Sequence, residues 1–154
     1  MNIGLNEQIR EKSVQQLHEL IANEFVLYVK TLKFHWNVKS SFFGSLHKLF
    51  NDQYEDLLKM IDDIAERCLA LGLPSTGTLK EFLDAATVQE EPGVYPSYKN
   101  MIEQLVIDHE IVIRHIRSAA QKTQEWDDMG TNNFLLNLIE KHEKMAWMLR
   151  SYLE

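Results

Sequence analysis

The sequence has 154 residues, of which 45% are hydrophobic and 25% are charged, and its formal net charge is −7 at pH 7. These values are ordinary for a globular protein, and the length suffices for one domain over residues 1–154 with a sizeable core. The acidic balance disfavours nucleic acid as a partner of the bulk surface, and no apolar run approaches the roughly 20 residues of a membrane span. The single cysteine, Cys68, excludes an intrachain disulfide, and no signal peptide is visible, so we expect a cytoplasmic protein.

The first half of the sequence predicts two long helices, over about 6–37 and 43–71. In both segments apolar residues recur three and four positions apart, which is typical of a helix with one buried face. The predicted apolar face of the second helix begins at Phe43. The segment KSSFFG separates the two helices, and Gly72 and Pro74 end the second one.

The second half predicts one short and two further long helices. Within the connection over 73–96, the segment TLKE has a capping-box pattern, which predicts a short helix over about 79–86. Helical periodicity returns over about 97–126 and 132–152, with DDMGT as the break between them. Met145 and Met148 lie at helical positions in the last segment, and we expect both in the core.

These elements predict an all-α fold, a four-helix bundle with a short extra helix in the long second-to-third connection. Short links favour antiparallel neighbours, so the first and second long helices should pair, and likewise the last two. The long connection is free to cross the bundle from end to end. One such crossover is the ferritin-like arrangement among bundle topologies.

Two histidines, His35 and His47, flank the break near Ser41 and are equally distant from it. In an antiparallel hairpin they come level, where they can share a metal ion or serve as hydrogen-bonded core residues. The Glu-x-x-His pattern of common di-iron bundles is absent from the sequence. The four remaining histidines show no partner pattern; they are His18, His109, His115 and His142.

Carboxylates for such a site occur at Asp62 and Glu66, four positions apart on one face of the second helix. His47 and Asp62 are fifteen positions apart, which corresponds to roughly 22 Å along a helix, too far for one ion. The two halves meet only if a second copy of the chain packs antiparallel across a two-fold axis, which generates two equivalent sites. The alternative is that the carboxylates belong to an ordinary solvated helix face.

Several segments closely resemble the Dps family of mini-ferritins over nearly the whole chain: HWNV from His35, the second histidine at His47, DDIAER followed by LG, and EKMAWMLRSYL near the end. The resemblance implies a homo-oligomer, a dodecameric shell of four-helix subunits. It implies ferroxidase sites at two-fold interfaces, built from His35 and His47 of one subunit with Asp62 and Glu66 of the next. Members of the family oxidise Fe²⁺, preferably with hydrogen peroxide, store ferric iron in the shell and protect against oxidative damage.

The sequence departs from the family pattern at one ligand position. Four residues after His47 the family usually has Asp, whereas this chain has Asn51, and the neighbouring Asp52 is turned away by the helix. A neutral carbonyl oxygen in place of a carboxylate predicts weaker iron binding, particularly of a second ion. Trp36 is either an electron donor to the site or a packing aromatic.

Two further features bear on iron entry and on partners. The resemblance places Asp127 and Asp128 at three-fold pores through which iron enters, and the alternative is an acidic helix-capping turn. Many family members bind DNA, but the first nine residues contain no Lys or Arg and the sequence ends without a basic extension, so direct DNA binding is not expected. A DNA-binding nucleoid protein and a shell with impaired ferroxidase activity remain the alternatives to an iron-oxidising storage enzyme.

Overall fold

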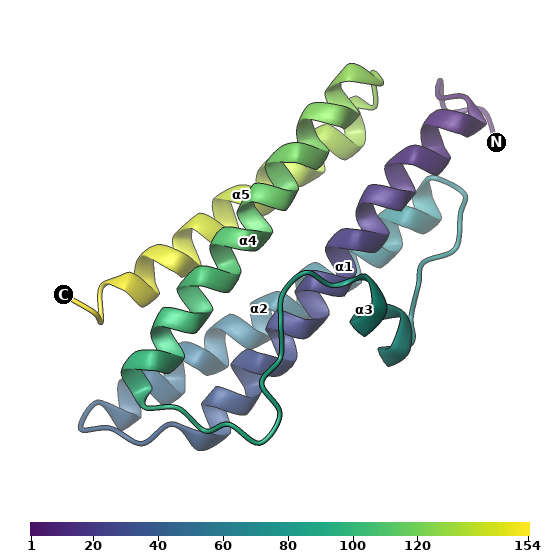
Figure 1. Cartoon of the computed structure of the whole chain (residues 1–154). Helices are drawn as coiled ribbons and strands as arrows, with labels where there is room; N and C mark the ends of the chain where they lie inside the picture. Colours follow the sequence, from purple (N-terminus) through teal and green to yellow (C-terminus); the bar gives the residue numbers. More distant parts are fainter.

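The computed structural model describes all 154 residues and contains five helices and no strands (Figure 1). Two long helices, α1 (Glu7–Asn37) and α2 (Phe43–Ala70), form a first antiparallel hairpin. A second hairpin consists of α4 (Tyr98–Glu125) and α5 (Met129–Arg150). The all-α bundle predicted from the sequence is therefore confirmed.

The connection between the hairpins carries α3 (Leu79–Ala85) and runs from the far end of α2 back to the start of α4 (Figure 1). Thr78 and Glu81 form the predicted capping box, in which each side chain accepts a hydrogen bond from the backbone of the other residue. Phe82 of α3 stacks on Phe25 of α1 with ring centroids 4.6 Å apart. The crossover is thus packed along the outside of α1.

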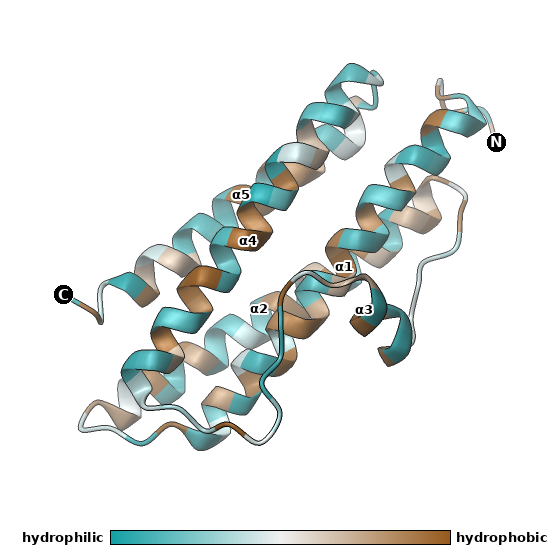
Figure 2. Ribbon diagram, viewed as in Figure 1, coloured by the Kyte–Doolittle hydropathy of each residue, from teal (hydrophilic) through white to brown (hydrophobic).

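Hydrophobic residues recur along every long helix and alternate with hydrophilic ones (Figure 2). Their buried faces meet in one hydrophobic cluster of 33 residues contributed by all five helices and the connection. Burial of such apolar surface is the main source of stability in a bundle of this size. None of the helices combines the length and the apolar character needed to cross a membrane.

Three details differ from the sequence-based expectations. Helix α5 begins at Met129 rather than near residue 132, because the Asp128 side chain accepts a hydrogen bond from Thr131 N and caps the helix at that point. Phe43 is 48% exposed because it lies in the first turn of α2 at the end of the bundle, where its ring stacks on His47 with centroids 5.0 Å apart instead of entering the core. Met148 is 38% exposed, whereas Met145, one helical turn earlier, is buried as predicted.

Candidate metal centre

The structure brings His35 and His47 face to face across the first hairpin. His35 lies in the last turn of α1, and His47 lies in the first turns of α2. Their rings stack with centroids 3.8 Å apart and planes inclined by 19°. Both side chains are half-buried, so they have neighbours that fix them and a side that solvent or a partner can reach.

Each imidazole is held by the backbone of the other. His35 Nδ1 lies 2.8 Å from the carbonyl oxygen of His47, and His47 Nδ1 lies 2.9 Å from the carbonyl oxygen of His35. A carbonyl oxygen only accepts, so both Nδ1 atoms carry the proton and donate. In the neutral rings the Nε2 lone pairs are therefore left free, which is the state of a histidine that binds a metal through Nε2.

The last turn of α1 explains why one of these carbonyls is available. The final carbonyl groups of an α-helix have no backbone N–H four residues further along inside the helix. His35 belongs to that turn, and His47 Nδ1 satisfies its carbonyl oxygen from the neighbouring helix. The same hydrogen bond satisfies a free carbonyl at the end of α1 and orients the His47 imidazole.

Asn51 lies one turn beyond His47 and is already engaged. The Tyr54 hydroxyl donates to Asn51 Oδ1 over 2.8 Å, and the Tyr54 ring packs edge-on against His35 with centroids 5.3 Å apart. Asp52 is exposed and forms an ion pair with Lys48, whose Nζ lies 2.6 Å from Asp52 Oδ2. The carboxylate next to Asn51 therefore points to solvent and a lysine.

Asp62 and Glu66 lie on the exposed side of α2, away from the histidine pair. No group of three or more His, Cys, Asp and Glu side chains within one chain is placed to hold a metal ion. The chain thus contains a two-histidine half-site and, separately, an exposed pair of carboxylates. A site that adds Asp62 or Glu66 to the two imidazoles has to draw the carboxylates from another copy of the chain.

The two aspartates before α5 have different surroundings. Asp128 is 1% exposed, caps α5, and lies 3.3 Å from Arg67 Nη2. Gly130 leaves room for this arginine, because a Cβ at that position would lie 2.8 Å from Arg67 Nη2. Asp127 is exposed, with a left-handed backbone at φ 60°. Within one chain, only Asp127 of this pair presents its side chain to the surface.

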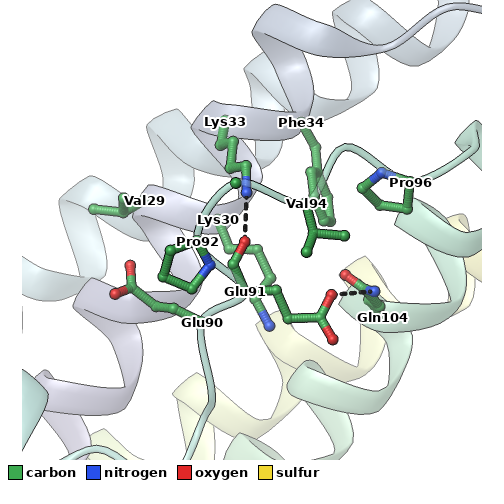
Figure 3. A pocket seen from close by; sticks show the side chains of 11 residues that line it. Val29, Lys30, Lys33, Phe34, Glu90, Glu91, Pro92, Val94, Pro96 and Gln104 are labelled. Carbon is green, nitrogen blue, oxygen red and sulfur yellow. Dashed lines mark hydrogen bonds between the residues drawn. The ribbon is translucent and has the colours of Figure 1, made fainter.

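A separate cavity of about 320 Å³ lies between α1, the start of α4 and the segment around Glu91 (Figure 3). Two hydrogen bonds join polar groups of its lining: Lys33 Nζ donates to the Glu91 carbonyl oxygen, and Gln104 Nε2 donates to Glu91 Oε2. Neither His35 nor His47 lines it. The cavity is therefore not the metal centre.

Sequence reasoning found no partner for two histidines that the structure joins. His109 of α4 and His142 of α5 face each other in the bundle interior, and His142 also contacts Glu24 of α1. All three residues are fully buried. The available signal was Glu24 itself, a charged residue inside the apolar stretch LIANEFVL, because a buried carboxylate requires a partner.

Comparison with known proteins identifies the class of protein to which the fold belongs. The family model of the ferritin-like domain matches residues 14–154. The chain is 34% identical over 149 residues to DNA protection during starvation protein 2 of Bacillus anthracis, covering 97% of this chain and 99% of that protein. It is 43% identical over 155 residues to an uncharacterized low temperature-induced protein of Nostoc, covering 100% of this chain and 87% of that protein.

Solved structures agree with these relatives. DpsC from Streptomyces coelicolor has a TM-score of 0.97 at 28% identity, covering 100% of this chain and 90% of that chain. The Dps protein of Vibrio cholerae, described as a member of the ferritin-like diiron-carboxylate superfamily, has a TM-score of 0.93 at 30% identity and covers 100% and 97%. The fold is thus that of the ferritin-like class. Within this class the chain belongs to the Dps family, and this membership supports a general role in iron storage and protection.

Proposed function

We propose that this protein is a ferroxidase and iron store whose sites form between subunits. His35 and His47 of one subunit bind Fe²⁺ together with Asp62 and Glu66 of a neighbour across a two-fold axis. The observation that carries the proposal is the reciprocal donation of both Nδ1 protons to backbone carbonyls, which leaves two oriented Nε2 lone pairs side by side. Imidazole and carboxylate are suitable ligands for Fe²⁺.

The subunit arrangement follows from where the ligands lie. The half-site at the α1–α2 turn and the carboxylates further along α2 are separated on one chain but are brought together when two α2 helices run antiparallel. A dodecameric shell, which the family resemblance implies, supplies such two-fold contacts and an interior for ferric mineral. Trp36, next to His35 and 69% exposed, is included in the proposal as an interface aromatic or an electron donor.

The proposed reaction takes hydrogen peroxide as the oxidant. Two Fe²⁺ ions each give up one electron, and the two electrons, with two protons, reduce one H₂O₂ to two water molecules. Asn51 contributes at most a neutral oxygen, and the Tyr54 hydroxyl already occupies one of its lone pairs. We therefore propose that the site binds a second Fe²⁺ ion more weakly than the first. The second candidate function is a shell with impaired ferroxidase activity.

Subunit mixing tests the shared site directly. One variant carries His35→Ala and His47→Ala, and the other carries Asp62→Ala and Glu66→Ala; each alone should lack rapid Fe²⁺ oxidation. When the two are unfolded and reassembled together, about a quarter of the sites should be complete, because each mixed two-fold interface forms one intact site. A mixture as inactive as its components would contradict the inter-subunit site. Iron oxidation by assembled wild-type protein decides between the active and impaired shells.

A further inference from the structure

The most unusual buried feature outside the proposed site is a triad of ionisable side chains from three helices, Glu24, His142 and His109, called the buried triad below. His142 Nε2 lies 2.7 Å from Glu24 Oε1, and His142 Nδ1 lies 3.0 Å from His109 Nδ1. Each residue has 0% of its surface exposed. The triad joins α1 of the first hairpin to α4 and α5 of the second.

The contact between the two imidazoles limits how many protons the triad holds. A hydrogen bond between two Nδ1 atoms needs a proton on one atom and a lone pair on the other. An imidazolium carries protons on both nitrogens, so His109 and His142 cannot both be charged while this contact exists. The folded triad accommodates one imidazolium, which the Glu24 carboxylate can balance when His142 carries the charge.

If His109 gained a further proton, no other group in the structure would accept a hydrogen bond from it or balance its charge. His109 Nε2 and Glu24 Oε2 are both buried without a hydrogen-bond partner. A charged group without a partner in such surroundings is strongly destabilised. Burial lowers the pKa of His109 well below its ordinary value, and the charges of His142 and Arg150 lower it further.

The charged groups around the triad are few. From α5, Arg150 opposes a proton on His109 and is itself paired with Glu110 of α4. Lys30 of α1 and Asp108 of α4 form their own buried ion pair, with Nζ 2.6 Å from Oδ2.

Two more residues complete these surroundings. Burial also lowers the pKa of His115 on α4, which is the remaining nearby histidine. Helix α2 buries Gln53 but none of its charged side chains. No carboxylate other than Glu24 is thus available to the two imidazoles of the triad.

We propose that the buried triad is an acid-sensitive contact between the two hairpins. It holds α1 against α4 and α5 while no more than one imidazole is charged, and it opens when both are protonated. This role concerns the subunit itself and does not depend on the proposed iron chemistry.

The direction of the pH dependence follows from counting protons. Once the contact is open, both imidazoles bind protons below their ordinary pKa near 6.5, so the open state holds one proton more than the closed state. The closed state is therefore fully favoured above that pH and is weakened as the pH falls. Each pH unit below about 6 should raise the opening equilibrium about tenfold.

Two substitutions should change this slope in opposite directions. His109→Asn keeps an amide near the position of Nδ1 but removes one titrating group, so the tenfold rise per pH unit should disappear. Glu24→Gln keeps an acceptor for His142 but removes the charge that balances an imidazolium, so the closed state loses both protons and the rise should approach about 100-fold per pH unit. The Glu24 charge also raises the pKa of His115, so all the variants are compared in a His115→Asn background.

The measurement is hydrogen exchange of α1 amides near Glu24 in the assembled protein between about pH 8 and pH 5, corrected for the intrinsic exchange rate. His18→Asn changes a histidine of α1 whose ring contacts the Pro74 carbonyl oxygen and not the triad, so it should reproduce the wild-type slope. Equal slopes in wild type, His109→Asn and Glu24→Gln would overturn the proposal. So would opening on addition of EDTA at pH 8, because it would identify the triad as a metal site. If His109→Asn fails to assemble, an unchanged slope in Glu24→Gln still overturns it.

Discussion

The chain contains two histidine pairs that differ in the hydrogen-bond partner of the Nδ1 atoms. In the outer pair, His35 and His47, a backbone carbonyl accepts from each Nδ1, so both Nε2 atoms are free at a half-buried surface. In the inner pair, His109 and His142, the two Nδ1 atoms satisfy each other inside the bundle. The outer pair thus keeps two lone pairs available for the cation that we propose, and the inner pair shares one proton between its two Nδ1 atoms.

The largest effect should come from replacing His142, the residue of the inner pair that contacts both His109 and Glu24. His142→Ala leaves the Glu24 carboxylate and His109 buried without partners, and a buried charge that loses its partner costs about 3–5 kcal/mol of the free energy of unfolding. Denaturant unfolding of the assembled protein measures the loss. His18→Ala is the control, because it removes only a contact to the Pro74 carbonyl, worth about 1 kcal/mol. Equal losses would mean that the triad does not stabilise the bundle.

The outer pair should affect chemistry rather than stability. The His35→Ala/His47→Ala double variant should lower the rate of Fe²⁺ oxidation at least about 100-fold, because it removes both nitrogen ligands of the proposed site. Its helical content should match that of wild type in circular dichroism. His109→Asn is the matched control and should oxidise Fe²⁺ at the wild-type rate at neutral pH. If the control loses as much activity as the double variant, the two pairs do not have separate roles.

A smaller and opposite effect is expected next to the outer pair. Asn51→Asp places an anionic oxygen one turn beyond His47 and should tighten Fe²⁺ binding about tenfold, which titration calorimetry under anaerobic conditions would detect. Asp52→Asn is the control, since Asp52 is exposed and paired with Lys48. An unchanged affinity in Asn51→Asp would exclude position 51 from the coordination of iron.

The smallest effect should follow from Tyr54→Phe. The substitution removes the hydroxyl that donates to Asn51 Oδ1 but keeps the ring against His35. Loss of one such hydrogen bond is worth about 1 kcal/mol, so iron affinity should change only several-fold. In the Asn51→Asp background the effect should be larger, because the hydroxyl then donates to a carboxylate. A double-mutant cycle on iron affinity measures this coupling, and additive effects would show that Tyr54 does not act through position 51.

The sequence by itself determined the elements and the outer pair. Helical periodicity and the capping box at Thr78 are local signals, and the structure confirms the helices to within a few residues. His35 and His47 are twelve positions apart around one turn, so their proximity follows from hairpin geometry alone. The spacing of Asp62 and Glu66 from His47 predicted the partner carboxylates, and the family motifs, which surround these same residues, implied the same set.

Only the tertiary structure decided the proton positions and the inner triad. The tautomers of His35 and His47 depend on backbone carbonyls of the opposite helix, which no sequence pattern encodes. Glu24 and His142 are 118 positions apart and meet only because the two hairpins pack against each other. Local periodicity places each side chain on a buried face, but it does not select which buried side chains meet, since that depends on the rotation and register of whole helices.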